Sequence, residues 1–443
     1  MTVKLHIPKV GLAREDVIKQ LNSAKTDDVD WVNGRSWSLI YYAGDKHTGV
    51  VRDAYDLYFS ENAAGPSMFP SLRRLEDEVI SMVLDLLGSR GDEVGAMTSG
   101  GTESILLAMK AYRDQARDRK PEVSIPEVLI PESAHPAFLK AAHYLGLRVV
   151  PVPLNADYET DIHALRQRIT TRTVCMVASA PSLPHGVMDP VAAMAEVASE
   201  CGIGLHVDAC LGGFLLPFMR QLAYRVPEFD FGVPGVTSLS VDLHKNGYAA
   251  KGASAILYRT GELRRYQYYV NTDWPGGAYA SPTMMGTRPG GAVAAAWASL
   301  MALGRDGYLE MARRTMDTAN ALMKGIAVLP GLSIIGKPVM NVFAFGAEDI
   351  DIFTLADRLD TRGWRVNRQN HPGSLHMIAT PNHREAVSPF LQDLQAALAI
   401  ERRQPSRSAA KRCAFLYGGS AILNSGGELK EIALSQLDGL YSL

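Results

Sequence analysis

Lys245 has the sequence setting of a reactive amine. It follows His244 in the short polar turn Asp242-Leu243-His244-Lys245, which comes after a strand-like run that includes Ser240. Burial of a lysine beside other positive groups lowers its pKa, so that the neutral amine can attack an aldehyde. We therefore expect Lys245 to be such an amine, with an ordinary surface lysine in a loop as the alternative.

Asp208 is a carboxylate placed where a ligand could bind. It ends the apolar run that begins at Ile203, in the string HVDA (206–209). In open α/β sheets, ligands bind at the carboxyl ends of the parallel strands. An ionised carboxylate there can keep a pyridine nitrogen protonated, which makes the ring an electron sink. A helix N-cap or a metal ligand explains Asp208 equally well on local grounds.

The segment TSGGTES (98–104) has the composition of an anion-binding turn. Gly100 and Gly101 let the backbone approach an anion closely, and the helical pattern that follows directs free N–H groups at it. Ser99 and Thr102 add hydroxyl donors. Because a Gly-Gly turn with a Thr cap is common, this segment alone indicates a phosphate site only weakly.

Together, these signals indicate one cofactor. Phosphate cup, acid and lysine occur in the chain order of the pyridoxal 5′-phosphate (PLP) enzymes with an aspartate-aminotransferase-like fold. His135 lies between cup and acid. A lone histidine is more often structural, but its place in this series favours stacking on the PLP ring. The sequence thus predicts PLP as the cofactor, held by Lys245 as a Schiff base.

The elements that must position these residues are those of an α/β protein. From about 70 to 260, helical patterns alternate with short Val- and Ile-rich runs, which indicates βαβ units and a mainly parallel sheet covered on both faces. Helices are expected at 71–87 and 103–118, and strands at 127–130, 147–153, 173–178, 203–207 and 254–258.

The rest of the chain reads as a smaller α+β domain. A turn at 304–308 is expected to start a long helix, with apolar runs following at 332–335 and 341–345. A chain of 443 residues is also longer than one ordinary domain. We expect fold type I, the aspartate-aminotransferase-like PLP fold, with a mainly parallel seven-stranded sheet in its large domain. The expected division is an N-terminal segment (1–60), a large PLP-binding domain (61–305) and a C-terminal small domain (306–443).

Composition argues against several classes of partner. The chain is 47% hydrophobic and 21% charged, with a formal net charge of −2, which is typical of a globular protein. This charge gives no electrostatic reason to expect nucleic acid. Lys4, Lys9 and Arg14 interrupt the N-terminal apolar residues, so no signal peptide or membrane-spanning segment is expected. The four cysteines lack CxxC or metal-ligand spacing, which predicts no metal site and free thiols in a cytoplasmic protein.

In several longer strings, the sequence resembles the sphingosine-1-phosphate lyases, and among them the bacterial enzymes that have no membrane helix. This family belongs to the group II PLP-dependent decarboxylase-like enzymes. The resemblance runs from about Gly34 to the C-terminus. The strings that carry it are TSGGTES (98–104), KAYRD (110–114), ESAHPAF (132–138), ASAPSLPHGVMDP (178–190), HVDACLGGF (206–214), VTSLSVDLHKNGYAAKG (236–252) and TDWPGGAYASPTMMGTRPGG (272–291). The cup and the HVDA string are shared by a large group of PLP enzymes, whereas the last string narrows the resemblance to this family.

The resemblance implies a role for each cofactor-site residue. Lys245 would be the Schiff-base lysine, Asp208 the partner of the pyridinium nitrogen and His135 the residue stacked on the ring. Within the cup that also contains Ser99 and Gly100, the implied contacts of the PLP phosphate are Gly101, Thr102 and His244. Thr287 would reach the phosphate bound by the neighbouring subunit, which requires a homodimer with shared active sites.

The resemblance also implies a substrate. Tyr41, Asn62 and Lys251 match family positions near the head-group phosphate of a phosphorylated long-chain base such as sphingosine 1-phosphate. The implied reaction is a retro-aldol cleavage to a fatty aldehyde and phosphoethanolamine. One departure concerns that phosphate: the string NAAGP (62–66) stands where the family has NPLHP. Gly65 therefore replaces a histidine that would help to hold the head group.

Two other readings compete with the lyase. A PLP-dependent amino-acid decarboxylase shares the cup, Asp208 and Lys245, because PLP activates whichever bond at Cα stands perpendicular to its ring. The string 272–291 and Lys251 favour the lyase over the decarboxylase. A degenerate, non-enzymatic scaffold is disfavoured, because every residue expected to contact the cofactor is present.

Overall fold

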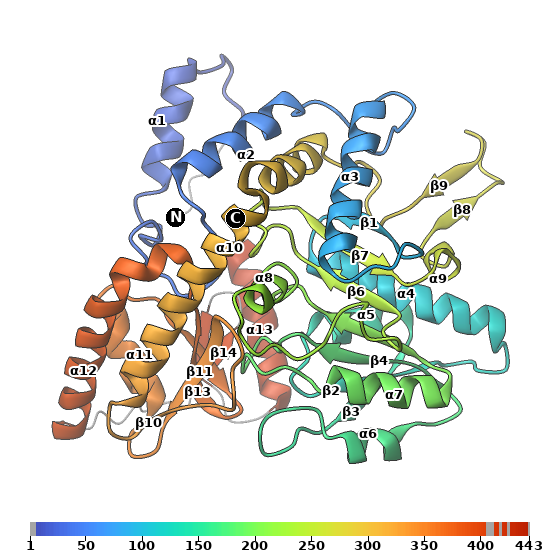
Figure 1. Cartoon of the computed structure of the whole chain (residues 1–443). Helices are drawn as coiled ribbons and strands as arrows, with labels where there is room; N and C mark the ends of the chain where they lie inside the picture. The colour runs from blue at the N-terminus through green and yellow to red at the C-terminus, as the bar shows by residue number, and fades with distance from the viewer. Residues whose placement is uncertain (1–5, 405–411, 416–418, 423–425, 442–443) are drawn as a thin grey trace.

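The computed structural model describes residues 6–404, 412–415, 419–422 and 426–441. It has a large α/β part around a seven-stranded sheet and a smaller α+β part, which lie side by side (Figure 1). This is the expected architecture of fold type I. The division at 1–60, 61–305 and 306–443 stays a prediction.

The large sheet has the strand order β1-β7-β6-β5-β4-β2-β3. Only β7 runs against its neighbours; the other strands are parallel to one another. Its strands are β1 (Val94–Thr98), β2 (Glu127–Pro131), β3 (Arg148–Val152), β4 (Thr173–Ser179), β5 (Gly204–Asp208), β6 (Ser238–Val241) and β7 (Ser254–Tyr258). Strand β1 is additional to the runs that the sequence predicted.

Helices cover both faces of this sheet, because alternate residues of its strands feed two separate cores. In β4, Met176 and Ala178 join the core that contains α3 and α7, whereas Cys175 and Val177 join the core that contains α4 and α5. Burial on both faces explains why these strands read as continuous apolar runs rather than alternating ones. The helices of this part are α3 (Pro70–Leu86), α4 (Gly101–Arg119), α5 (Ala137–Leu145), α6 (Ile162–Arg168), α7 (Val191–Cys201), α8 (Leu216–Gln221) and α9 (Gly261–Arg265).

The long helix begins earlier than the sequence predicted. Helix α10 spans Gly290–Ala327 and contains one break, at Gly304, where φ is 58° and ψ is −178°. The Ala-rich stretch before Gly304 already favours helix, so the glycine interrupts the helix instead of preceding it. The start expected near 304–308 was therefore wrong, and α10 crosses the expected boundary between the two domains.

The smaller part contains an antiparallel sheet with the order β10-β11-β13-β12. Its core also takes in Trp37 from the N-terminal segment, which is fully buried and stacked against Trp364 and His383. The elements are β10 (Leu332–Ile334), β11 (Val342–Ala347), α11 (Ile352–Asp360), β12 (Asn367–Asn370), β13 (Gly373–Ile378), a 3₁₀ turn (Pro381–Ala386), α12 (Val387–Arg403), β14 (Arg412–Phe415), β15 (Gly419–Ile422) and α13 (Gly426–Tyr441).

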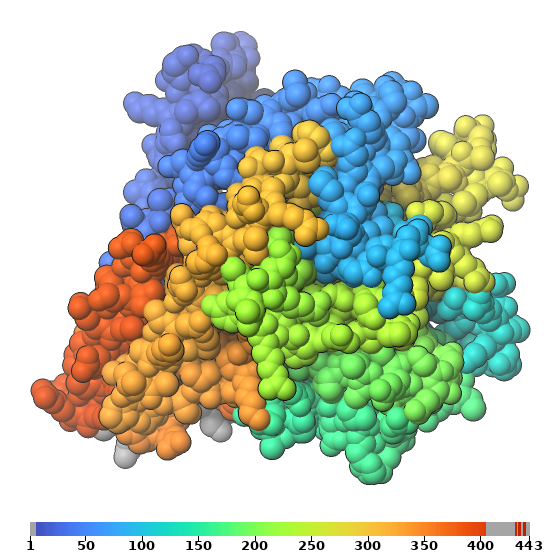
Figure 2. Space-filling model, in the orientation of Figure 1, coloured from blue at the N-terminus to red at the C-terminus, as the bar shows by residue number. Residues whose placement is uncertain are grey.

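Two segments project from the body of the molecule (Figure 2). Helix α1 (Arg14–Ala24) buries none of its residues, in contrast to α2 (Asp45–Leu57), which packs on α10. The hairpin of β8 (Tyr269–Asn271) and β9 (Tyr279–Ser281) exposes aromatic side chains, among them Trp274. Among the described helices, none is long and apolar enough to cross a membrane.

Candidate active site

A cavity of about 420 Å³ lies at the carboxyl ends of β4, β5 and β6. The large sheet and the first turn of α4 supply one side of it, whereas Asn367, His376 and Ile378 of the smaller part and Ser38 and Leu39 of the N-terminal segment supply the rest. Such an edge of a parallel sheet is the usual ligand site of open α/β folds. Three separate parts of the chain therefore have to pack together before the cavity exists.

Ten of the twelve predicted site residues line this cavity: Tyr41, Ser99, Gly100, Gly101, Thr102, His135, Asp208, His244, Lys245 and Lys251. Asn62 and Thr287 do not. They lie near each other instead, because Asn62 forms an isolated β-bridge with Pro289. The side-chain oxygen of Asn62 accepts the backbone N–H groups of Ala64 and Arg288, each at 3.0 Å, and Thr287 is exposed.

The phosphate cup forms the N-terminus of α4, as expected, because the helix begins at Gly101. A Cβ atom on Gly101 would lie 2.8 Å from the Sγ atom of Cys210 and 3.1 Å from both carboxylate oxygens of Asp242. Only glycine permits this close packing of the cup against the turn before Lys245. The free N–H groups of the first helical turn thereby face the cavity region as an anion site.

Ser99 lies at the cavity wall, but its donors are already used. Its backbone N–H and its hydroxyl both donate to Oε2 of Glu103, at 2.7 and 2.6 Å. The expectation that this hydroxyl donates to the cofactor phosphate therefore does not match the geometry. The signal for this was Glu103 itself, four residues further along the same string.

Lys245 pairs with the carboxylate of Asp242, for which the sequence predicted no role. Its Nζ atom lies 3.0 Å from Oδ2 of Asp242, and Nε2 of His244 lies 3.6 Å from the same oxygen. Burial lowers the pKa of Lys245, but the carboxylate of Asp242 raises it, and the net pKa lies above the ordinary value. The expectation of a lowered pKa was wrong, because the nearest charge is negative. An acid three residues before the lysine was the available signal.

Asp208 is held by a chain of hydrogen bonds. Its Oδ1 atom accepts the N–H of Cys210 at 3.0 Å and the hydroxyl of Ser240 at 3.1 Å. Ser240 then contacts Nε2 of His206 at 3.3 Å, and Nδ1 of that ring lies 2.8 Å from the hydroxyl of Ser238.

The direction of this chain follows from the charge on His206. Burial lowers the pKa of His206 to about 4, so the ring is neutral at pH 7. A neutral ring has one donor and one acceptor nitrogen. Since Ser240 gives its only hydroxyl proton to Asp208, His206 donates through Nε2 and accepts through Nδ1. A backbone N–H group and a hydroxyl group thus fix the carboxylate of Asp208 in place.

His135 is oriented for contact through its ring face. Its Nδ1 atom accepts the backbone N–H of Ala137 at 3.1 Å. Burial is the main cause that lowers the pKa of His135, so the ring is neutral at pH 7, with its proton on Nε2. A neutral planar ring at the cavity wall fits the predicted stacking role.

Lys251 lines the cavity beside Tyr41. Its Nζ atom donates to the carbonyl oxygens of Leu39 at 3.1 Å and His244 at 3.4 Å, and lies 5.3 Å from the centre of the Tyr41 ring. Burial and the charge of Lys245 lower the pKa of Lys251. This lysine is exposed and, within the described part of the chain, its ammonium group forms no ion pair with a carboxylate, so that group is available to an anionic ligand.

Sequence reasoning also missed the wall that the smaller part contributes. His376 is 1% exposed, and its Nε2 atom contacts the carbonyl oxygen of Leu183 at 2.9 Å. Neither His376 nor Asn367 stands in a recognisable string, so no local signal could have placed them in the cavity. In the described residues, no group of three or more His, Cys, Asp or Glu side chains is arranged to hold a metal ion.

The residues present fit PLP. The cavity brings together an anion site at a helix N-terminus, a lysine amine, a carboxylate fixed by hydrogen bonds and a planar imidazole. Phosphate, aldehyde, pyridine nitrogen and ring face each have a counterpart among them. The glycine at position 101, which keeps the cup open and close to Asp242, supports the same conclusion. The fold and the site together define a PLP-dependent enzyme of fold type I.

Comparison with known proteins narrows this class. Residues 41–348 match the pyridoxal-dependent decarboxylase conserved domain. The chain is 41% identical to a sphingosine-1-phosphate lyase of Oryza sativa subsp. japonica over 445 residues, covering 99% of this chain and 82% of that protein. The structure of a Burkholderia pseudomallei K96243 sphingosine-1-phosphate lyase superposes with a TM-score of 0.90 at 36% identity, covering 99% and 98% of the two chains. An L-aspartate/L-glutamate decarboxylase of Pyrococcus horikoshii is 32% identical over 396 residues, covering 89% and 100%. The chain belongs to the sphingosine-1-phosphate lyase family.

Replacing Asp208 by Asn should leave PLP bound but remove most activity, because a neutral amide cannot hold the proton on the pyridine nitrogen. The loss should be about 10²–10³-fold in kcat, the effect of removing one fixed electrostatic partner. Steady-state rates and the absorbance of bound PLP measure the two effects separately. Near-parental turnover in the Asp208→Asn variant would show that another group holds this proton.

Proposed function

We propose that this protein cleaves phosphorylated long-chain bases, such as sphingosine 1-phosphate, to a fatty aldehyde and phosphoethanolamine. The observation that carries the proposal is Lys251, a second lysine in the cavity that contacts the ring face of Tyr41. Lys251 supplies a positive charge in addition to that of Lys245, which is assigned to the cofactor. Family membership agrees with this activity.

The lining of the cavity suits such a substrate. Apolar side chains form much of the wall beside the charged residues: Leu39, Ile105, Leu183, Leu211 and Ile378. A phosphorylated long-chain base has one anionic end, an amine and an aliphatic chain. Apolar surface in contact with that chain contributes about 25 cal/mol per Å² removed from water.

Each polar residue then has a task in the cleavage. Bound PLP supplies a ring that takes up the electron pair of the broken bond. Asp208 keeps the ring nitrogen protonated, and His135 holds the ring from one face. Lys245, replaced on the cofactor by the substrate amine, would be a free amine beside Asp242 that can take the proton of the substrate's C3 hydroxyl and return it at Cα.

Selection of the bond depends on the phosphate. Because the phosphate lies away from the bond that breaks, its binding energy can fix the torsion about the amine-bearing carbon. Lys251 and Tyr41 are the residues of this cavity proposed to hold it, whereas Asn62, the third predicted residue, lies outside the cavity of its own chain. An amino-acid decarboxylase remains the second candidate, since the cofactor residues are common to both. The amino-acid substrate of a decarboxylase, however, carries no phosphate that Lys251 could bind.

The proposal includes a homodimer with shared sites. Thr287 lies outside its own chain's cavity, which is compatible with a role in a neighbouring site. The proposal also includes a cytoplasmic location: the three described cysteines, Cys175, Cys201 and Cys210, are free thiols, the form expected in a reducing compartment.

Product analysis tests the reaction itself. With sphingosine 1-phosphate, we expect a fatty aldehyde and phosphoethanolamine in equal amounts and no CO₂. Glutamate and aspartate, assayed in parallel, should release no CO₂ above the rate of the Lys245→Ala variant. CO₂ release from either amino acid without aldehyde from the lipid would favour the decarboxylase.

Lys251→Ala should lose lyase activity while PLP stays bound, because the phosphate loses a charged hydrogen-bond partner. We expect kcat/KM to fall on the order of 100-fold, and free sphingosine to be a very poor substrate of the parent protein. Lys140→Ala is the matched control, since Lys140 lies 5.6 Å from the ring of Tyr144 on the exposed side of α5. Equal rates for Lys251→Ala and the parent would refute this assignment.

Complementation tests the shared sites. Lys245→Ala and Thr287→Trp chains should each be inactive alone. After subunit exchange at equal amounts, half of the dimers are mixed, and each mixed dimer has one site with both residues intact. Activity should therefore return to about a quarter of the parental value. If each site used only its own chain's Thr287, no intact site would form and no rescue would occur, even with exchange shown by mass spectrometry.

A further inference from the structure

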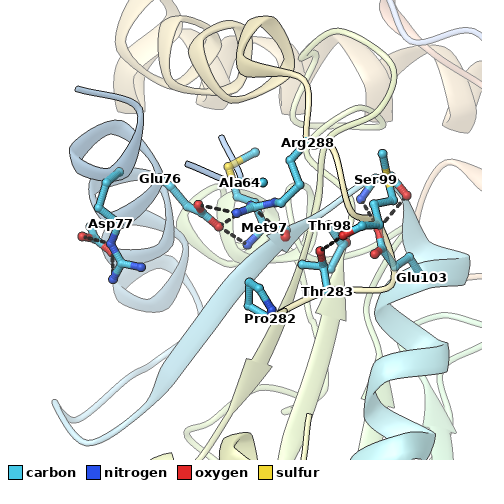
Figure 3. Close-up of polar contacts among 12 residues, drawn as sticks. Ala64, Glu76, Asp77, Met97, Thr98, Ser99, Glu103, Pro282, Thr283 and Arg288 are labelled. Carbon is cyan, nitrogen blue, oxygen red and sulfur yellow. Dashed lines mark hydrogen bonds and ion pairs between the residues drawn. The ribbon is translucent and has the colours of Figure 1, made fainter. Parts of the chain in front are cut away.

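Residues 282–288, here called the strap, run along the cup on their way to α10. The strap contains Thr287 and belongs to the string that distinguishes this family. Figure 3 shows the cup and the strap side by side, with Glu76 next to Met97 of β1 and Glu103 next to Ser99 in the turn that follows β1. Each carboxylate receives donors from the strap and from the β1 region.

Glu103 joins the two segments through one side chain. Oε2 accepts the N–H and the hydroxyl of Ser99 in the cup, at 2.7 and 2.6 Å (Figure 3). Oε1 accepts the N–H of Met284 in the strap, at 2.8 Å. Glu103 is 6% exposed, and within the described part of the chain it has no ion pair, so these three donors compensate its charge. Burial of a carboxylate is costly without such donors.

Glu76 anchors the end of the strap. The guanidinium of Arg288 forms a bidentate ion pair with the carboxylate of Glu76, with hydrogen bonds of 3.0 and 2.6 Å (Figure 3). It also donates to the carbonyl oxygen of Met97 at 3.3 Å. The N–H of Met97 donates back to Glu76 at 3.1 Å. Thr287, directly before Arg288, is exposed between the two anchors.

We infer that Glu103 is a positioning residue that couples the strap to the phosphate cup. One rigid carboxylate fixes Ser99 and Met284 relative to each other, so the strap is ordered where the cup is formed. Coupling of this kind is reciprocal: a phosphate group bound in the cup stabilises the strap, and an ordered strap stabilises the cup. The role of Thr287 in the site of a neighbouring subunit rests on the proposed homodimer, but the coupling within one chain does not.

A purely local role for Glu103 makes a different prediction. An acidic side chain in the first turn of α4 stabilises the helix through its dipole and through the bonds to Ser99. That role would affect the cup and leave the strap unchanged. Backbone exchange in the strap therefore separates the two roles.

The test replaces Glu103 by Gln, which keeps the shape but removes the charge and one acceptor. Hydrogen exchange followed by mass spectrometry would be measured on peptides covering 282–288 and on peptides of the cup, with and without PLP. We expect exchange at Met284 to rise about 10-fold or more in the variant. In the parent, PLP should slow exchange in the strap, and in Glu103→Gln this response should be lost.

Affinity for PLP gives a second readout. We expect its dissociation constant to rise about 10-fold in Glu103→Gln, because ordering the strap no longer assists the cup. Glu401→Gln is the matched control, because Glu401 is also a buried carboxylate, 2% exposed, and forms an ion pair with Arg358. Both residues belong to the smaller part, so this variant should lose stability without a change in the strap. If Glu103→Gln does not fold, Glu103→Asp keeps the charge but is one methylene too short to bridge both segments.

The outcomes separate the coupling from the proposed function. Parental exchange at Met284 in both Glu103 variants, or a strap that PLP still protects in them, would overturn the coupling. A protein that proves monomeric, or that releases CO₂ instead of aldehyde, would overturn the proposed function while the exchange result stands on its own.

Discussion

The buried carboxylate of Asp242 is the charge around which the cofactor cavity is arranged. It is 2% exposed, pairs with Lys245 at 3.0 Å and faces Gly101 of the cup so closely that a Cβ atom there would lie 3.1 Å from both its oxygens. The neighbouring positive charges favour its ionised form, so its pKa is lowered although burial alone would raise it. The start of α4 at Gly101 and the turn that contains Lys245 therefore meet at this one ionised carboxylate.

Other buried carboxylates of the site are also compensated by contacts with distant parts of the chain. Asp208, Glu103 and Glu76 are all buried, and each is compensated by donors from a different part of the chain. Each such group stabilises the fold only in the one arrangement that supplies its donors, because a buried charge without them costs several kcal/mol. The rigidity needed to hold a flat cofactor thus comes from acids that touch backbone N–H groups and hydroxyls as well as cations.

The topology of the sheet explains why residues so far apart in sequence meet. Strands β4, β5 and β6 are adjacent and parallel, so Ser179, Asp208 and the turn after Val241 end at one edge. Strand β7 runs in the opposite direction and brings Lys251, just before it, to the same edge. The smaller part then covers this edge with β12 and β13, which leaves a cavity lined by both polar and apolar residues.

Local sequence by itself predicted the cofactor residues and determined most of the elements around them. Lys245, Asp208 and the cup could be recognised because each sits in a short string, next to an apolar run or a helix start, whose chemistry is readable from a few neighbours. Tertiary structure decided what depends on contacts between distant segments. The raised pKa of Lys245 follows from the orientation of Asp242, the use of the Ser99 donors follows from Glu103, and the covering wall of Asn367 and His376 comes from more than 100 residues further along the chain. Sequence patterns report burial and local conformation, whereas charge compensation in a folded site depends on which groups the packing brings within hydrogen-bond distance.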